Sequence, residues 1–164
     1  MTPIKISFFD TSAIVKLLCG EEPGSAEVKR IFDGTTVFTS WILLAEAMGV
    51  LKRKWIKKEI SEEQYAGRVH YLLALIRDRR FLIRDIEIKD HEACLKTYEY
   101  DLIDIRKKHP ELDVADALQL IAIQEGILGK LAGESTPNLV TADLKLGNAA
   151  LVDGIQVIFI DVLL

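Results

Sequence analysis

The sequence predicts an α/β fold with a mainly parallel sheet of four to five strands and helices on both of its faces. Short apolar runs rich in β-branched and aromatic residues alternate with longer segments of helical spacing along the chain. This alternation is typical of parallel sheets, whose crossover connections are helices. The 164 residues contain no internal repeat and no Pro/Gly-rich linker, so we predict a single domain over residues 1–164.

The order of the expected elements places two acids at one edge of this sheet. The expected strands are Ile4–Phe9, Thr36–Phe38, Phe81–Ile83, Asn138–Thr141 and Ile155–Ile160. The expected helices run from a Thr11 or Ser12 cap to about Cys19, over Ala26–Phe32, from a Ser40 cap over Trp41 to about Lys57, over Ser61–Arg79, over Ile88–Lys107, from about Asp113 to Gly126, and over Leu144–Leu151. Sites in such folds lie beyond the carboxyl ends of the strands, where Asp10 and Asp143 are expected to meet.

Composition favours a cytoplasmic protein without membrane contact. Apolar residues make up 49% and charged residues 28% of the chain, and no apolar run is long enough to serve as a signal peptide or to span a bilayer. Cys19 and Cys94 lie in helix-like apolar patterns, so we expect small core residues in a reducing compartment. The net charge of −4 counts mildly against nucleic-acid binding, although carboxylates filled with a divalent cation would invert the local sign.

Two acids stand in unusual apolar surroundings. Asp10 directly follows the first strand, where a helix cap explains it as well as a site does. Glu46 is the one charged residue between Val37 and Leu51, in a helix that is apolar nearly all round. A thin polar stripe with Gly49 and Arg53 is the alternative for Glu46, and we favour the functional interpretation.

Three further acids precede or begin helices. Asp113 and Asp116 are three residues apart and share a helix face, so Asp113 is expected to be the cap. Asp116 leads an apolar run and is expected to point along the rim of the sheet. Asp143 follows the Asn138–Thr141 strand, and capping of the next helix explains it about as well as a functional role.

Taken together, four acids at the inner ends of apolar elements indicate a metal site. Converging carboxylates repel one another unless they are protonated or bound to cations, and hard divalent ions prefer oxygen ligands. Other chemistries lack their motifs. The three histidines, His70, His91 and His109, form no zinc pattern, and no Walker loop or GxGxxG occurs. Neither Ser12 nor Ser40 has a histidine at a plausible strand end for a catalytic triad.

The sequence resembles the PIN-domain family, and within it the VapC branch of toxin–antitoxin systems. The resemblance rests on FFDTSAIVKL, TSWILLAEAMGVL, LDVADALQLIAI and LVTAD, in this order, and extends from Ile4 to about Ile160. It implies a three-layer α/β/α fold, a homodimer, and a ribonuclease that uses Mg²⁺ or Mn²⁺ to cut an RNA substrate. It also implies a small antitoxin protein that enters the groove. The region 57–80 is longer than in a compact VapC, which leaves the substrate and the antitoxin mode open.

The resemblance also assigns roles to residues. The four metal-binding and catalytic acids that it implies are Asp10, Glu46, Asp116 and Asp143, and the two supporting hydroxyls are Ser12 and Thr141. Basic clusters at 52–58, 77–80 and 106–108 are candidate RNA contacts, although such runs are usually solvated helix faces. Two alternatives remain: a PIN-like module that binds RNA or protein without cutting, and a phosphoacceptor or phosphatase domain with Asp10 at its centre.

Overall fold

The structure, a computed structural model, describes residues 5–83, 91–124 and 137–161. Within these residues five strands form one sheet in the order β3-β2-β1-β4-β5, with every neighbouring pair parallel. The strands are β1 (Ile6–Phe9), β2 (Thr36–Thr39), β3 (Phe81–Ile83), β4 (Asn138–Thr141) and β5 (Gln156–Phe159). The predicted parallel sheet is confirmed. Successive strands are added on one side of β1 up to β3 and on its other side from β4 onward, so the strand order switches between β1 and β4. Ligands bind at this point in such folds.

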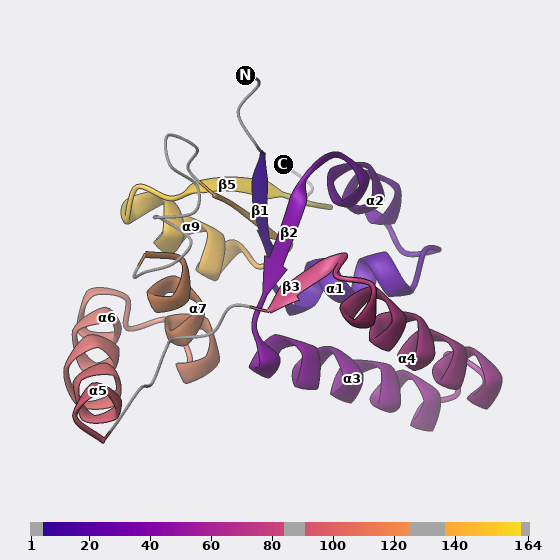
Figure 1. Cartoon of the computed structure of the whole chain (residues 1–164), viewed down its shortest axis with the longest axis horizontal. Helices are drawn as coiled ribbons and strands as arrows, with labels where there is room; N and C mark the ends of the chain where they lie inside the picture. The colour runs from indigo at the N-terminus through magenta and orange to yellow at the C-terminus, as the bar shows by residue number, and fades with distance from the viewer. Residues whose placement is uncertain (1–4, 84–90, 125–136, 162–164) are drawn as a thin grey trace.

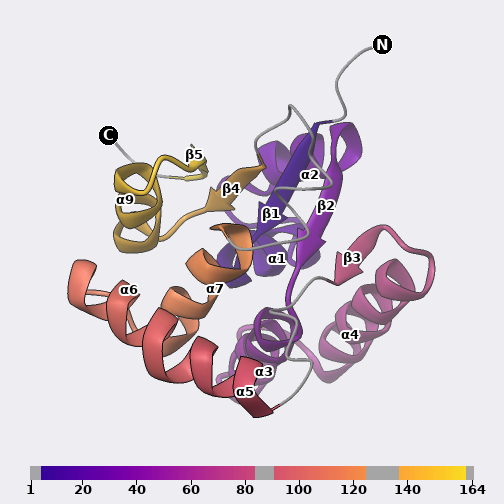
Figure 2. The same ribbon diagram turned by 60° about the vertical axis from the view of Figure 1, so that its left-hand side comes forward.

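Helices cover the sheet on both sides, as predicted. They are α1 (Thr11–Leu18), α2 (Ser25–Gly34), α3 (Trp41–Ile56), α4 (Glu62–Arg77), α5 (His91–Leu95), the π-helical segment η1 (Lys96–Asp101), α6 (Leu102–Lys108), α7 (Val114–Gln124) and α9 (Leu144–Val152). In Figure 1, α1 to α4 lie to the right of the central strands and α5, α6, α7 and α9 to the left; Figure 2 turns the α5–α6 side forward.

Two expected helices differ from the prediction. The segment expected to be one helix over Ile88–Lys107 is α5, η1 and α6 in succession, so a π-helical turn interrupts its α-helical geometry. Residues 88–90 of that prediction lie outside the described residues, as do Glu125 and Gly126, at the predicted end of the helix that begins near Asp113. The first helix is capped by Asp10 rather than by Thr11 or Ser12.

The core fixes the end of β1, where the first acid stands. Phe8 and Phe9 are fully buried. The Phe9 ring packs against Phe32 of α2 and Phe81 of β3, with centroids 6.2 and 6.0 Å apart, in tilted and edge-on geometry. Thr39 at the end of β2 donates a hydrogen bond to the Phe9 carbonyl oxygen at 3.0 Å. Apolar burial on both sides of β1 therefore holds Asp10 at a defined point of the rim.

A polar cluster anchors both ends of α7. His109, which precedes α7, is 4% exposed, and its Nε2 lies 3.0 Å from Oδ1 of Asp153 at the end of α9. Gln124, the last residue of α7, donates to the other oxygen of Asp153 at 2.6 Å, and Lys108 pairs with the same carboxylate. The buried charge is thereby partnered on several sides, and α7 is fixed against α9.

The region 57–80, expected to be an extension, completes a helical hairpin of α3 and α4. Ser61 and Gln64 form a reciprocal capping box at the start of α4, with hydrogen bonds of 3.1 and 2.8 Å. The rings of Trp55 and Tyr65 stack at 5.2 Å between the two helices. The hairpin thus connects β2 to β3 and carries Glu46 on its first helix.

Cys19 is buried, as expected, and its sulfur accepts a hydrogen bond from Arg68 of α4 at 3.3 Å. The side chain of Cys94 lies outside the described residues. Among the helices that the structure describes, none combines the length and the apolar character needed to cross a membrane.

Two helical glycines predict stability changes of opposite sign. A Cβ at Gly147 of α9 would overlap the ring of Phe159, whereas a Cβ at Gly67 of α4 would meet no atom within 4 Å. Gly147→Ala should therefore lower the free energy of unfolding by about 1–3 kcal/mol through overpacking. Gly67→Ala should raise it by about 0.5–1 kcal/mol by favouring the helix.

Urea unfolding followed by circular dichroism measures both changes. Equal shifts in the two variants would contradict the packing of α9 against β5.

Candidate active site

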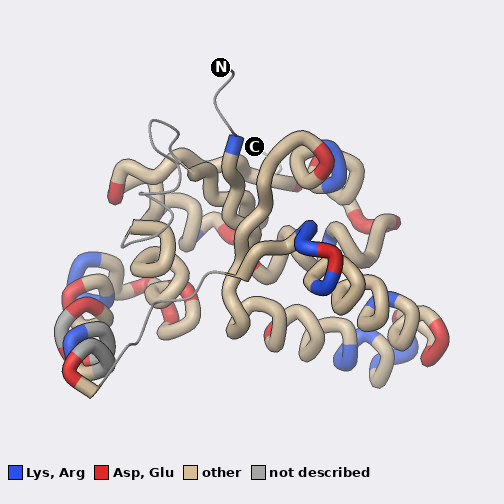
Figure 3. The backbone as a smooth tube through the Cα atoms, in the orientation of Figure 1, with Lys and Arg blue, Asp and Glu red and all other residues tan. Residues whose placement is uncertain are grey.

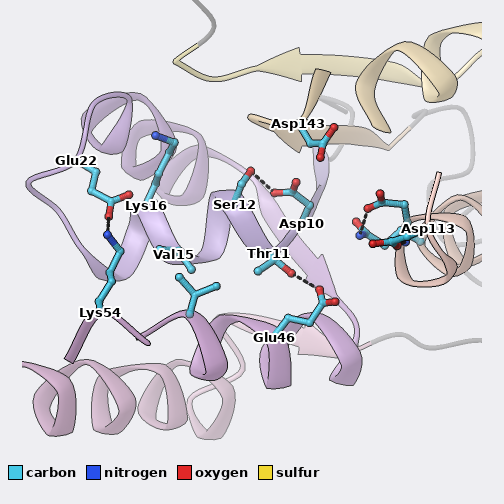
Figure 4. A pocket seen from close by; sticks show the side chains of 13 residues that line it. Asp10, Thr11, Ser12, Val15, Lys16, Glu22, Glu46, Lys54, Asp113 and Asp143 are labelled. Atoms are coloured by element: carbon cyan, nitrogen blue, oxygen red, sulfur yellow. Dashed lines mark hydrogen bonds and ion pairs between the residues drawn. The ribbon is translucent and has the colours of Figure 1, made fainter. Parts of the chain in front are cut away.

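An open cleft of about 410 Å³ lies at the carboxyl ends of β1 and β4 (Figure 4). All four acids predicted from the sequence line it. The lining residues are Asp10, Thr11, Ser12, Val15, Lys16, Glu22, Glu46, Val50, Lys54, Asp113, Asp116, Gln119 and Asp143. Segments that are far apart in the sequence, from the β1–α1 junction, α3, α7 and the β4–α9 turn, therefore supply carboxylates to one cavity.

Asp10 is the buried centre of this cleft. It is 3% exposed and caps α1, because its Oδ1 accepts the Ala13 N–H at 2.8 Å. The same oxygen accepts the Ser12 hydroxyl at 2.7 Å, and Oδ2 accepts the Thr141 hydroxyl at 2.5 Å. The cap interpretation of Asp10 is thus correct, and the residue lines the cleft as well. Burial raises the pKa of Asp10, and these hydrogen bonds oppose that effect.

Ser12 and Thr141 each connect Asp10 to the β4–α9 turn. The Ser12 oxygen accepts the Ala142 N–H at 2.8 Å while its hydroxyl donates to Asp10. The Thr141 oxygen accepts the Asp143 N–H at 2.8 Å while its hydroxyl donates to Asp10. The two hydroxyls therefore set the orientation of the Asp10 carboxylate relative to the backbone on which Asp143 lies.

Glu46 occupies the cleft from α3, but its surroundings differ from the prediction. Its side chain is exposed, and α3 buries Leu43, Leu44, Ala47 and Leu51 only. The expectation of a buried charge in a helix surrounded by apolar contacts was wrong, because residues such as Trp41, 59% exposed, face outward. The Thr11 hydroxyl donates to Glu46 Oε2 at 2.7 Å and turns the carboxylate toward α1 (Figure 4).

Helix α7 begins with the predicted cap and presents Asp116 to the cleft. Asp113 Oδ1 accepts the Asp116 N–H at 2.9 Å, as expected for a cap and the third helical residue. Gln119, one turn further on, donates from Nε2 to Asp116 Oδ1 at 3.3 Å. Asp143 caps α9 by accepting the N–H groups of Lys145 and Leu146 at 2.7 and 3.1 Å, so it too is both a cap and a lining residue.

Asp10, Glu46, Asp116 and Asp143 have no basic partner among the described residues. The two lysines that line the cavity pair with other acids. Lys16 donates to the Pro23 carbonyl oxygen and pairs with Asp161 at 3.1 Å. Lys54 pairs with Glu22 at 2.7 Å and with Glu59 at 3.4 Å. Negative charge therefore accumulates around Asp10 and Asp116 without compensation.

This charge has its largest effect on Asp116. Its pKa is raised from 3.8 to about 7, first by burial and then by the neighbouring carboxylates of Asp113, Asp143, Asp10 and Glu46. Near neutral pH the group is thus poised between its charged and neutral forms. A perturbed acid in a cleft is a frequent mark of a functional site.

The carboxylates surround the cleft without being drawn together. Among the parts of the chain that the structure describes, no three Asp, Glu, His or Cys side chains stand close enough to share one metal ion. Mutual repulsion favours this spread. Three of the four predicted acids are exposed or half-buried, so their side chains have room to move, whereas Asp10 is held by its hydrogen bonds.

Sequence reasoning missed three contributors to the cleft. Thr11 orients Glu46, Asp113 adds charge beside Asp116, and Gln119 touches Asp116 from within the helix. The signal for Asp113 and Gln119 was helical spacing, since residues 113, 116 and 119 follow one another at i, i+3. Nothing in the sequence pattern indicated the contact of Thr11 with a residue 35 positions away.

The raised pKa of Asp116 predicts a pH-dependent cost to folding in the absence of divalent ions. The folded chain holds a proton that the unfolded chain has lost, so stability falls as pH rises from about 4 to about 7. Asp116→Asn removes this cost and should stabilise the protein at pH 8 by on the order of 1–3 kcal/mol, with little effect at pH 4.

Thermal unfolding in EDTA at a series of pH values measures this difference. Asp104→Asn, an exposed position on α6, is the matched control and should show no such trend. An Asp116→Asn stabilisation that is the same at every pH would contradict the electrostatic account.

Comparison with known proteins agrees with the fold. The sequence model of the PIN domain family matches residues 7–150. A chain in the crystal structure of VapBC2 from Rickettsia felis bound to a DNA fragment from its promoter superposes with a TM-score of 0.56 at 18% identity, covering 95% of this chain and 99% of that one. PAE2754 from Pyrobaculum aerophilum superposes with a TM-score of 0.50 at 17% identity, covering 90% and 86%. No curated protein sequence matches the chain.

At these identities the two solved structures support the fold alone, whereas the family match extends over most of the chain. The parallel sheet, the carboxylates at the ends of β1 and β4 and the match over residues 7–150 lead to one conclusion: the chain belongs to the PIN domain family.

Proposed function

We propose that this PIN domain is a divalent-metal-dependent endoribonuclease that hydrolyses phosphodiester bonds in RNA. One observation carries the proposal: the carboxylates of Asp10, Glu46, Asp116 and Asp143 line one cleft, and no cation among the described residues compensates them. Charged groups that are brought together at a cost to the fold are typical of sites that bind an ion of opposite sign.

The donor set fits Mg²⁺ or Mn²⁺. All four groups offer carboxylate oxygens, the ligands that hard divalent ions prefer, and among the described residues no histidine or cysteine lines the cavity. We assign these four acids as the residues that hold the ion. When bound, the ion would supply activation of water and neutralisation of charge on the phosphate.

The remaining residues of the cleft act on the acids. Ser12 and Thr141 hold the Asp10 carboxylate in one orientation through bonds to both of its oxygens. Thr11 holds Glu46 on the facing helix. These contacts hold Asp10 at the end of β1 and Glu46 on α3, on two sides of the cleft. Both carboxylates would therefore face a substrate phosphate and its attacking water.

Positive charge for an RNA backbone lies outside the cleft. Figure 3 marks Lys and Arg positions in blue near the C-terminal end of α3, between β3 and α4 and on α6. Part of this charge is used within the protein, since Arg77 pairs with Asp78 and Arg80 with Asp33. Phosphate contacts by the rest would give a salt-dependent affinity despite the net charge of −4.

We further propose that the protein is the toxin of a VapBC-type pair, with a small antitoxin as its partner and a homodimer as its own assembly. The sequence resemblance to the VapC branch and the similarity to a chain of the VapBC2 complex support this assignment. An antitoxin segment with Lys or Arg side chains would complement the cleft and compete with the ion. Light scattering of the purified chain tests the dimer.

Removal of the Asp10 or the Asp116 carboxylate should prevent efficient cleavage. We expect the wild-type protein to cut structured RNA only when Mg²⁺ or Mn²⁺ is present. Asp10→Asn and Asp116→Asn should each reduce the rate by about 100-fold or more, because charge stabilisation at the reacting phosphate is lost. Asp33→Asn, a surface position that pairs with Lys29 on α2, is the control and should retain activity.

The end groups of the products test the chemistry independently. Attack by water in line with the leaving oxygen leaves 5′-phosphate and 3′-hydroxyl ends. Mass spectrometry of the fragments should therefore find these ends, and 2′,3′-cyclic phosphates would contradict the mechanism.

Two alternative functions predict different experimental results. A non-catalytic PIN-like module would bind RNA or protein without cutting and would lose no partner binding on Asp10→Asn. A phosphoacceptor or phosphatase domain would gain the mass of a phosphoryl group on Asp10 after treatment with a small acyl phosphate. Both oxygens of Asp10 are hydrogen-bonded and the residue is only 3% exposed, which leaves little room for such an attack.

A further inference from the structure

Gln119 is a buried amide at the wall of the cleft, and within the described part of the chain only one end of this amide has a hydrogen-bond partner. It is 3% exposed, lies on α7 one turn beyond Asp116, and lines the cavity. Its Nε2 donates to Asp116 Oδ1 at 3.3 Å. Its Oε1 is buried and has no hydrogen-bond partner among the residues that the structure describes.

A buried amide with one unsatisfied end is costly. A carbonyl oxygen removed from water without a partner costs about 1–3 kcal/mol. Methionine has nearly the same volume, good helix propensity and no such cost. Most other positions in this stretch of α7 are apolar, with Ala117, Leu120 and Ile121 buried. The polar side chain at 119 therefore weakens the fold, and the residue that it touches lies in the cleft.

The chemistry of an amide suits a place beside a metal-binding carboxylate. The N–H group donates to the carboxylate without adding positive charge, so the attraction of the cleft for a cation is kept. A lysine or arginine in this position would neutralise the same carboxylate. The reverse orientation of the amide would set Oε1 against the Asp116 oxygen, two acceptors facing each other, so the ionised acid selects the observed orientation.

We propose that Gln119 is a positioning residue for the divalent ion, an inference that rests on the proposed function. Its Nε2 donates to the Asp116 carboxylate and fixes the orientation in which that group would hold the ion, and the buried Oε1 is the cost of keeping an amide at this position. Partners of this kind, beyond the direct ligands, set ligand orientation and are worth about 10- to 100-fold in metal affinity.

The test compares Mn²⁺ affinity with thermal stability in two glutamine variants of the same helix. Gln119→Met should raise the unfolding temperature of the metal-free protein, because a buried unsatisfied oxygen is removed, and should weaken Mn²⁺ binding by about 10-fold or more. Gln124→Met is the matched control. Gln124 donates to Asp153 outside the cleft, so its loss should lower the unfolding temperature and leave Mn²⁺ affinity unchanged.

Titration calorimetry with MnCl₂ on the full chain gives the affinities, and Gln119→Leu repeats the test with a second apolar side chain. Wild-type binding that Asp116→Asn abolishes, together with equal affinities for wild type and both Gln119 variants, would overturn this inference and leave the metal site standing. Wild-type binding no stronger than that of Asp116→Asn would instead overturn the proposed function, and the role of Gln119 with it.

Discussion

The structure depends on one buried carboxylate. Asp10 ends β1, caps α1, and accepts hydroxyl groups from Ser12 and Thr141, so a single side chain joins the central strand, the first helix and the end of β4. Burial disfavours its charge, and the three hydrogen bonds oppose that effect without cancelling it, so the pKa of Asp10 remains raised. Because the same bonds fix the β4–α9 turn, Asp143 is placed by Asp10 as well. The remaining acids are added to this junction from α3 and α7.

The fold could be predicted from the sequence because its signals are local. Each strand is a short apolar run, and caps such as Ser40, Asp113 and Asp143 mark helix starts through bonds that span a few residues. The interruption by η1 could not be predicted in this way, because a change from i→i+4 to i→i+5 hydrogen bonding has no residue-type signal comparable to a helix cap. The exposure of Glu46 was missed for a related reason. Apolar content alone does not say which face of a helix is buried, and α3 leaves Trp41 and Ile42 exposed.

The sequence predicted which acids line the candidate site, but it did not predict the hydrogen bonds that orient them. Acids at strand ends must share one rim of a parallel sheet, which is a consequence of topology. The bonds from Thr11 to Glu46 and from Thr141 to Asp10 join residues 35 and 131 positions apart and depend on side-chain placement in three dimensions. The unpartnered oxygen of Gln119 is likewise a property of packing. The hydrogen bonds from Thr11, Thr141 and the Gln119 amide share a feature, since each orients a carboxylate without neutralising it. The cleft is thus less stable than it would be with basic partners, as is common where a protein binds an ion.

The central claim is that a divalent ion compensates these carboxylates, and proton release on binding tests it most directly. Because the pKa of Asp116 is raised to about 7, an ion that binds the charged form must expel the proton that the group partly holds. Mn²⁺ titrations at pH 6.5 in buffers of different ionisation enthalpy measure the number of protons released. The account predicts release of a large fraction of one proton at pH 6.5 and little release at pH 8.5. Binding without proton release at pH 6.5, or no binding at either pH, would contradict it.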